Sequence, residues 1–348
     1  MIQQLEDVLK EERLQQWLTI PEHRLTFGVV TRSGRWIWPS AANGEAEYAS
    51  DLYEIGSITK TFIGLLLAIG EERGIWSRLD PLAALVPELA SSPFAKQTTL
   101  LQLVTHTANL PAIPRNLRRT IQDKLNPYAH YSESDLIEAV LSEKPKAKGR
   151  HMYSNYSFGL LGWILSKQLG MSLHEAMGEL VFRPLGMKDT GLAGHLKDDA
   201  SLQPVFDAKG KPTPHWQFQQ SMAGAGAICS TISDMLAYAE ANAGLSSSPV
   251  SSALEECHKE HYSIFKKRGI GIGFGWMLYR EKNGSATHWH NGGTYGSSSF
   301  AAFNRAKGIG LVILSNRGVD LASQLPFIGS RKLNVDRFAR ILTDKLFG

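Results

Sequence analysis

A serine and a lysine three residues apart are the first residues in this chain whose types and spacing could do chemistry. Ser57 and Lys60 open an apolar stretch that is predicted to be helical from about residue 57 to residue 72. Because positions i and i+3 share one face of a helix, the lysine amine can lie beside the serine hydroxyl. A serine needs a neighbouring base to take its proton, and an amine in a dry pocket can lose its own proton and act as that base. The pair therefore indicates nucleophilic catalysis, although a serine that opens a helix can also be a simple N-cap.

The same spacing occurs a second time, in a different setting. Ser263 and Lys266 lie in a polar stretch, with Lys267 and Arg268 directly after them and no apolar helix behind. Nothing in this stretch would remove the lysine amine from water, so its proton would stay in place. We therefore interpret the second pair as a chance occurrence and favour Ser57.

A tyrosine and an asparagine form the next candidate group. Tyr153 and Asn155 precede a helical run over residues 158–169. Placed beside Lys60, the tyrosine could relay protons, and the asparagine amide could hydrogen-bond both the lysine and a substrate carbonyl. Taken alone, the pair would favour a core tyrosine with a satisfied hydroxyl.

A histidine and two glycines form the third candidate group. His290, Gly292 and Gly293 fall on a predicted strand, where alternation places His290 and Gly292 on the same face. Glycine weakens the interior of a strand unless a ligand or another backbone must come close. A substrate could lie along this strand edge and accept a hydrogen bond from the Gly293 N–H. Taken alone, the segment would favour a strand end with a core histidine.

The elements that must position these groups follow a simple order, with strands near both ends of the chain and helices between them. Residues 2–17 are predicted to form one amphipathic helix, and a hairpin follows over Leu25–Thr31 and Arg35–Pro39. Residues 76–230 have a helical pattern. Signals that resemble capping boxes occur at Thr99–Gln102, Ser172–Glu175 and Thr231–Asp234. Four late strands and a closing helix are predicted over Phe274–Arg280, Ala286–Asn291, Ser298–Asn304, Ile309–Ser315 and Val335–Phe347.

This order predicts an α+β fold of two parts. Residues 1–75 and 231–348 are expected to form a platform, a mostly antiparallel sheet flanked by helices, because most connections between its strands are too short for parallel crossovers. Residues 76–230 are expected to form an inserted all-helical subdomain. The three candidate groups can converge only where the two parts meet, so we expect the active site at their interface.

Composition and charge exclude several classes of function. The chain of 348 residues carries 37 Lys and Arg against 33 Asp and Glu, and its net charge of +4 is too small to indicate a nucleic-acid partner. The longest apolar run, residues 62–70, is too short for a membrane span, and the charged residues 1–17 do not resemble a signal peptide. We therefore expect a cytoplasmic protein without a membrane span, although an exported protein trimmed of its signal would have the same sequence.

The remaining cysteines and histidines that could react or bind a metal are interpreted as structural. Cys229 and Cys257 are too few for a disulfide scaffold, and Cys229 is expected to be a core thiol. Cys257 lies close to His258 and His261, which are metal-binding residue types, but the sequence offers no matching second pair of ligands. We therefore expect no metal. His106 ends a predicted helix and is expected to be structural.

Together the three groups resemble the serine β-lactamase and penicillin-binding-protein superfamily, and most closely its class C-like branch of β-lactamases, D-stereospecific peptidases and esterases. That family carries Ser-x-x-Lys, Tyr-x-Asn and Lys-Thr-Gly or His-x-Gly in this order, and the chain has Ser57–Lys60, Tyr153–Asn155 and His290–Gly292. The resemblance covers about residues 25–316. It includes the segments Tyr53–Phe62, Leu103–Thr107, Tyr153–Gly162, Arg183–Met187 and Ile313–Asn316.

The resemblance implies a β-lactamase/transpeptidase-like fold and an acyl-enzyme mechanism that needs no metal or organic cofactor. In this mechanism Ser57 attacks a carbonyl, Lys60 and Tyr153 manage the proton, and Tyr153 activates the water that releases the acyl group. The backbone N–H groups of Ser57 and Gly293 hold the oxyanion, while Asn155 positions the substrate amide.

Two departures from the family pattern shape the expected activity. His290 stands where the best-known β-lactamases and D-Ala-D-Ala peptidases have lysine, and a mostly neutral histidine attracts a substrate carboxylate less strongly. Around Asn109, where family members often have a Ser-Gly pair, the chain reads Thr107-Ala-Asn109. Asparagine tolerates a left-handed turn, so we expect this loop to be kept.

The predicted function is therefore that of a serine hydrolase acting on esters, D-aminoacyl amides or small peptides. Its expected partner is a small molecule or a short peptide, and β-lactams could be substrates or inhibitors. Two alternatives stay open: a β-lactamase of class C type, and a penicillin-binding sensor that releases its acyl group slowly.

Overall fold

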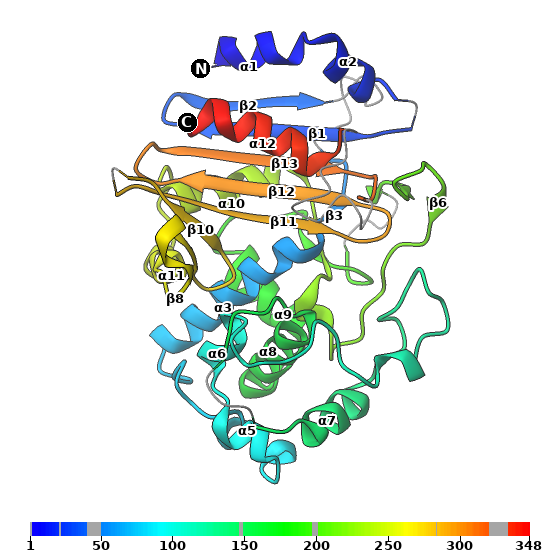
Figure 1. Ribbon diagram of the computed structural model, residues 1–348, viewed down its shortest axis with the longest axis vertical. Helices are drawn as coiled ribbons and strands as arrows, with labels where there is room; N and C mark the ends of the chain where they lie inside the picture. Colours follow the sequence, from blue (N-terminus) through cyan, green and yellow to red (C-terminus); the bar gives the residue numbers. More distant parts are fainter. Residues whose placement is uncertain are drawn as a thin grey trace.

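An antiparallel sheet of eight strands lies in the upper half of the view in Figure 1, above most of the helices, and it agrees with the α+β prediction. The computed structural model describes residues 2–20, 22–39, 50–145, 149–196, 201–282, 284–319 and 333–348. The sheet order is β2 (Gly34–Pro39), β1 (Leu25–Thr31), β13 (Ile309–Ser315), β12 (Ser298–Asn304), β11 (Ala286–Gly293), β10 (Met277–Arg280), β9 (Ile270–Ile272) and β8 (Tyr262–Phe265). The early hairpin therefore pairs directly with the late strands, through β1 and β13.

Alternation along the strands separates two hydrophobic cores. On β13, Leu311 and Ile313 face one core, whereas Val312 and Leu314 face the other. Helix α12 (Val335–Leu346) covers the first face, together with α1 (Ile2–Leu9) and α2 (Glu12–Leu18). Helix α10 (Ile232–Ala243) packs on β13 and β1 from the other face, which leads to the helical part of the molecule.

The prediction of one helix over residues 2–17 was wrong, because the segment forms two helices. The chain turns extended at Glu11, with φ −59° and ψ 126°, and α2 starts after it. The side-chain amide of Gln15 donates to the Leu9 carbonyl at 2.6 Å and so satisfies the end of α1. The two short helices lie beside the closing helix, so the ends of the chain meet on one face of the sheet (Figure 1).

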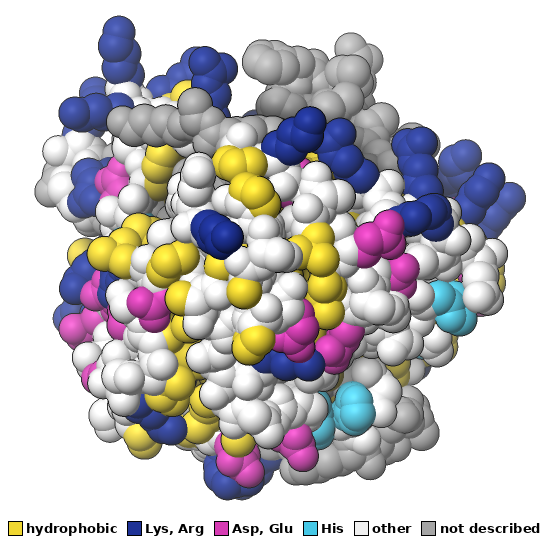
Figure 2. Space-filling view, turned by 90° about the horizontal axis from the view of Figure 1, so that it is seen from below, with side chains coloured by type: hydrophobic (Ala, Val, Ile, Leu, Met, Phe, Trp, Pro, Cys, Tyr) yellow, Lys and Arg dark blue, Asp and Glu magenta, His cyan; other side chains and the backbone are white. Residues whose placement is uncertain are grey.

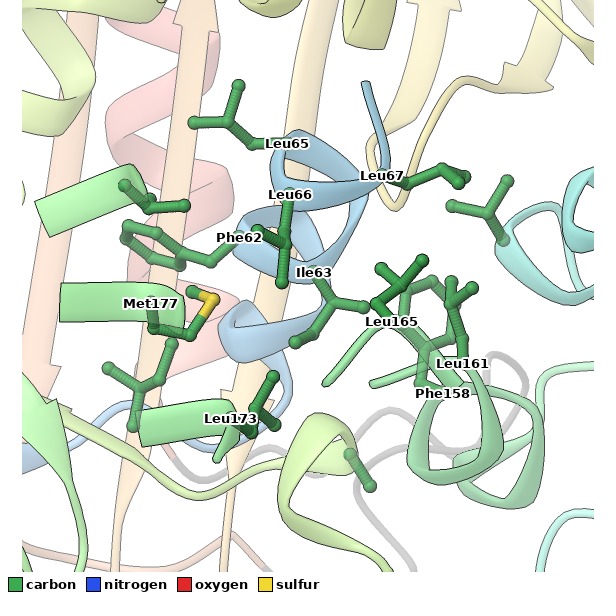
Figure 3. Packing of buried hydrophobic residues seen from close by; sticks show 14 of the residues in the cluster. Phe62, Ile63, Leu65, Leu66, Leu67, Phe158, Leu161, Leu165, Leu173 and Met177 are labelled. Carbon is green, nitrogen blue, oxygen red and sulfur yellow. The ribbon is translucent and has the colours of Figure 1, made fainter. Parts of the chain in front are cut away.

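Helix α3 (Thr59–Glu72) is the central helix of the second core, and its buried residues run from Thr59 to Gly70. Figure 3 shows Phe62, Ile63 and Leu66 of this helix between side chains of α8 (Asn155–Leu169) and α9 (Leu173–Met177). A helix that is apolar on all sides must be buried on all sides, and this packing fixes the front of α3 firmly.

The helical part of the chain also contains α4 (Leu82–Leu85), α5 (Pro93–Gln97), α6 (Leu100–Val104) and α7 (Glu133–Ser142). The predicted capping boxes at Thr99 and Ser172 are both present. At Thr231 only half of the box forms, because the Asp234 carboxylate accepts instead from the Asp189 N–H and the Thr190 hydroxyl. Short strands add to the predicted helices: β3 (Tyr53–Glu54), β4 (Gly191–Leu192), β5 (Val205–Phe206), β6 (Pro212–Thr213) and β7 (Ile228–Ser230).

Two late strands were not predicted, and one predicted strand begins later than expected. The turn over residues 273–276, closed by a hydrogen bond from the Gly273 N–H to the Trp276 carbonyl, delays β10 until Met277. Strands β8 and β9 are short and lie at the edge of the sheet, with helix α11 (Ser251–His258) before them. Such short edge strands leave little alternation to read in a sequence.

Acidic, basic and hydrophobic side chains are interspersed over the end of the molecule seen in Figure 2. This mixture on that face agrees with the small net charge of the chain. Among the described residues, no helix combines the length and the apolar character that crossing a membrane requires.

Candidate active site

The front of α3 brings the first candidate pair together. A single 3₁₀ turn, η1 (Gly56–Ile58), leads into the helix, so Ser57 and Lys60 stand one turn apart. Lys60 Nζ lies 2.9 Å from Ser57 Oγ, and the lysine is completely buried. Because burial disfavours the charged form of an amine, the pKa of Lys60 is well below its usual value of 10.5.

Two further contacts orient the N–H groups of the Lys60 amine. Its Nζ lies 2.9 Å from Asn155 Oδ1 and 2.7 Å from the carbonyl oxygen of Ala225, and both of these atoms can only accept hydrogen bonds. A neutral amine can donate its two N–H groups to these two acceptors. Its lone pair is then left for the Ser57 hydroxyl, which is the arrangement that a general base requires.

Tyr153 lies beside Ser57 and Lys60. Its hydroxyl interacts with Ser57, which acts to lower the pKa of the phenol, and its ring centroid is 5.0 Å from Lys60 Nζ. The residue is 42% exposed, yet desolvation of its hydroxyl raises the pKa of the phenol. Tyr153 is therefore a neutral donor and acceptor that touches the nucleophile.

His106 supports the loop that carries Tyr153, as a structural role predicts. It is 2% exposed, its Nδ1 accepts a hydrogen bond from the Ser154 N–H at 3.1 Å, and its ring packs 4.7 Å from that of Tyr153. Burial holds the pKa of His106 well below its usual range, so Nδ1 is free to accept. The neighbouring Asn109 has φ +57°, which confirms the predicted left-handed turn.

Asn155 is oriented from both ends of its amide. While Oδ1 faces Lys60, Nδ2 donates to the hydroxyl of Tyr128 at 3.1 Å. Tyr128 is buried, and burial raises its pKa to about 12, so it stays a neutral acceptor for this bond. Its ring also packs against Trp216 and Phe218, with centroids 5.4 and 5.2 Å away.

Gly56 and Gly292 allow the nucleophile turn to lie directly against strand β11. A Cβ on Gly292 would lie 2.0 Å from the Ile55 carbonyl oxygen, and a Cβ on Gly56 would lie 2.4 Å from the Gly293 nitrogen. Gly56 also has φ +50°, where a side chain is strained. The close approach predicted from these glycines is therefore one between two backbones, and it places Gly293 beside the turn that holds Ser57.

His290 lies in the same place as a neutral side chain. It is 3% exposed, and its ring centroid is 6.2 Å from that of Tyr153. Burial and the nearby Lys60 lower the pKa of His290 to about 3. Its Nδ1 donates to the Asn291 carbonyl at 2.5 Å, which leaves Nε2 as an acceptor. This strand carries no positive charge at the position where the family pattern often has lysine.

All the candidate residues therefore gather around Ser57, and the other groups do not join them. Ser263 and Lys266 are exposed, and they lie on β8 and in the 3₁₀ turn after it rather than at the start of an α-helix. Cys257 is buried, and desolvation raises its pKa, while His258 hydrogen-bonds Asn242. Within the described ranges, no group of three or more His, Cys, Asp and Glu residues is placed to hold a metal ion.

Three contributors to the site were missed at the level of sequence. The Ala225 carbonyl reaches Lys60 from the short turn Ala223–Ala225, and no side-chain pattern could have revealed a backbone acceptor. Tyr128 carries no neighbouring motif. Glu54 falls within the segment Tyr53–Phe62, for which only Ser57 and Lys60 were predicted to act. It is 3% exposed and hydrogen-bonds Thr294 beside the strand glycines.

Comparison with known proteins gives consistent results. The family model described as Beta-lactamase matches residues 27–326. A beta-lactamase of Pseudomonas fluorescens is 26% identical over 308 residues, which are 79% of this chain and 82% of that protein. Two solved structures share the fold. One is a class C beta lactamase from Rhodobacter sphaeroides, with a TM-score of 0.74 and 24% identity over 97% of this chain and 98% of that one. The other is the D-alanine carboxypeptidase AmpC from Burkholderia cenocepacia, with a TM-score of 0.76 and 23% identity over 92% of this chain and 96% of that one.

Proposed function

The chain belongs to the beta-lactamase family and is a class C-like serine hydrolase, and from that premise we propose that Ser57 forms an acyl-enzyme with esters, D-aminoacyl amides or small peptides. The observation that supports this best is the fully buried Lys60 amine, 2.9 Å from Ser57 Oγ and bonded to two obligatory acceptors. A desolvated amine in this position can take the serine proton as the hydroxyl attacks.

In the acylation step the proton moves from Ser57 Oγ to Lys60 Nζ while Oγ bonds to the substrate carbonyl carbon. The negative charge that develops on the carbonyl oxygen is held by the backbone N–H groups of Ser57 and Gly293. Loss of one such donor typically raises a barrier by about 3 kcal/mol. Tyr153 then passes a proton to the leaving group and takes one from Lys60, so that no charge remains on either residue.

In the deacylation step water attacks the same carbonyl carbon. Because the pKa of Tyr153 is raised, its phenolate is scarce near neutral pH. Tyr153 therefore acts as a relay: its oxygen accepts a proton from the water while its own proton passes to Lys60. The proton returns from Lys60 to Ser57 Oγ when the acyl bond breaks, and Asn155 holds the substrate amide throughout.

The preference for substrates without a carboxylate comes from His290. A lysine at this position would offer a fixed positive charge, whereas the buried His290 is neutral, with a pKa of about 3. A carboxylate placed there would lose its hydration without gaining an ion pair. Uncharged esters and amides do not need an ion pair at this position.

A β-lactamase of class C type is the second candidate, and the names of the relatives favour it. β-Lactams carry a reactive carbonyl that the same serine can open. A slowly deacylating sensor would use the same acylation step but would fail to position the water.

A substrate panel separates the three activities. The purified protein is assayed with p-nitrophenyl esters, D-aminoacyl p-nitroanilides and nitrocefin, alongside Ser57→Ala, and the protein is then weighed by mass spectrometry. Faster turnover of esters or anilides than of nitrocefin supports the proposal. Faster nitrocefin turnover would establish the β-lactamase instead, and a lasting adduct on Ser57 without any turnover would establish the sensor.

A further inference from the structure

Glu54 is a buried carboxylate next to the candidate site that the chemistry of Ser57 does not use. It lies on β3 and is 3% exposed. Its Oε2 accepts from the Thr294 hydroxyl at 2.6 Å, and its Oε1 accepts from the Trp216 backbone N–H at 2.8 Å and contacts His215 Nδ1 at 3.2 Å. A carboxylate is kept in such surroundings only when several donors satisfy it, and here those donors come from two distant segments.

One of these donors fixes the end of β11. Thr294 follows Gly293 directly, and its hydroxyl also accepts from the N–H groups of Gly296 and Ser297, at 3.2 and 3.1 Å. The Glu54 carbonyl in turn accepts from Ser297 Oγ at 3.0 Å. The turn after β11 is thus held by both the side chain and the main chain of Glu54, close to the start of the nucleophile turn.

The other donor fixes the segment that supports Asn155. The Trp216 backbone bonds Glu54, and the Trp216 ring lies 5.4 Å from Tyr128 and 5.3 Å from Tyr295, between centroids. Tyr128 accepts the hydrogen bond that orients the Asn155 amide. The Oε2 atom of Glu54 therefore contacts the turn next to Gly293, and its Oε1 atom contacts the segment that supports Asn155.

We infer that Glu54 is a positioning residue, which holds the Gly293 N–H and the Trp216 segment at a fixed distance from Ser57. This inference rests on the proposed function, since the place of the Gly293 N–H matters only where Ser57 generates an oxyanion. Donors that meet the charge of the transition state act on kcat more than on KM. A change in the Glu54–Thr294 bond should therefore lower kcat and leave KM nearly unchanged.

The test uses variants of both partners in this bond. Thr294→Val keeps the shape of the side chain and removes the hydroxyl, so kcat should fall about tenfold, less than the 10²–10³ expected for complete loss of an oxyanion donor. Thr294→Ser restores the hydroxyl and should recover most of the loss. Glu54→Gln should resemble Thr294→Val, and the double variant should lose little more than either single one, because both remove the same interaction.

A matched control separates positioning from general stability. Thr190 donates to the buried Asp234 at 2.7 Å and also hydrogen-bonds Ser230, and these side chains bond none of Glu54, Thr294 and Ser57. Thr190→Val should lower the melting temperature as Thr294→Val does but leave kcat unchanged. Equal kcat for Thr294→Val and Thr190→Val would overturn the inference and leave the proposed function intact. Failure of a fluorophosphonate to label Ser57 in the wild-type protein would instead overturn the proposed function and this inference with it.

Discussion

The two Ser-x-x-Lys sequences of this chain share residue types and spacing, yet the fold treats them in opposite ways. Ser57 and Lys60 stand on one turn of helical backbone, and Lys60 is completely buried. Ser263 lies on strand β8 and Lys266 in the 3₁₀ turn after it, and both are exposed. Extended backbone that ends in a turn does not bring residues three apart onto one face, as a single turn of helix does.

The difference shows which properties a motif of this kind depends on. Helical backbone brings the amine to 2.9 Å from the hydroxyl, and burial lowers the pKa of the amine so that it can accept a proton. Spacing alone brings about neither the short distance nor the lowered pKa. A third requirement is that the lone pair of the amine faces the serine, and Asn155 Oδ1 and Ala225 O favour this because they accept from both N–H groups of a neutral amine.

The largest expected effect is the loss of the nucleophile. Ser57→Ala should lower kcat by at least about 10³-fold on every substrate that the protein turns over, because no acyl-enzyme can form. Ser263→Ala should match the wild type within twofold. Steady-state rates and mass-spectrometric labelling with a fluorophosphonate check both variants. A label that persists in Ser57→Ala and disappears in Ser263→Ala would reverse the comparison.

Loss of the lysine should be the next largest effect. Lys60→Met keeps most of the side-chain volume and removes the base, so kcat should fall by about 10²–10⁴-fold, the usual share of general base catalysis. Lys266→Met, at the exposed position, should leave the rate unchanged and alter the free energy of unfolding by less than about 0.5 kcal/mol. Burst kinetics with a p-nitrophenyl ester would locate the loss in acylation, and an unchanged burst in Lys60→Met would rule out Lys60 as the base.

A third expected effect concerns His290 on β11, where this chain has a neutral side chain in place of a lysine. His290→Lys would place an amine where the neutral His290 lies, so KM for substrates with a free carboxylate should fall several-fold, as expected for a new charge-assisted hydrogen bond. KM for matched uncharged esters should not improve. His290→Gln serves as the uncharged control. Equal effects of both variants on the two substrate classes would show that charge at this position does not select substrates.

The sequence predicted those parts of the site that depend on local pattern. The apolar run of α3 and the alternation of His290 and Gly292 on β11 were sufficient to place Ser57, Lys60 and His290 on their elements. The contacts across the chain were not predictable in the same way. The Ala225 carbonyl and the Glu54–Thr294 bond join segments far apart in the sequence, and such contacts arise only when the chain has packed. The break at Glu11 was missed because an amphipathic pattern continues across it.

The last expected effect is on stability, and it measures the burial of the amine directly. In the unfolded chain Lys60 has its usual pKa of 10.5, whereas in the folded protein that pKa is lowered. As the pH falls below about 10.5, the unfolded state binds a proton that the folded state does not yet bind, so the wild type loses stability until the pH reaches the lowered pKa of the folded protein.

The variant Lys60→Met has no such titrating group. The free energy of unfolding of the wild type minus that of Lys60→Met should therefore rise with pH through this window, by at most about 1.4 kcal/mol per pH unit. Urea denaturation at several pH values between 7 and 10 gives this difference. A difference that does not change with pH, or one that falls as the pH rises, would mean that the amine keeps its proton in the folded protein and that Lys60 cannot be the resting base.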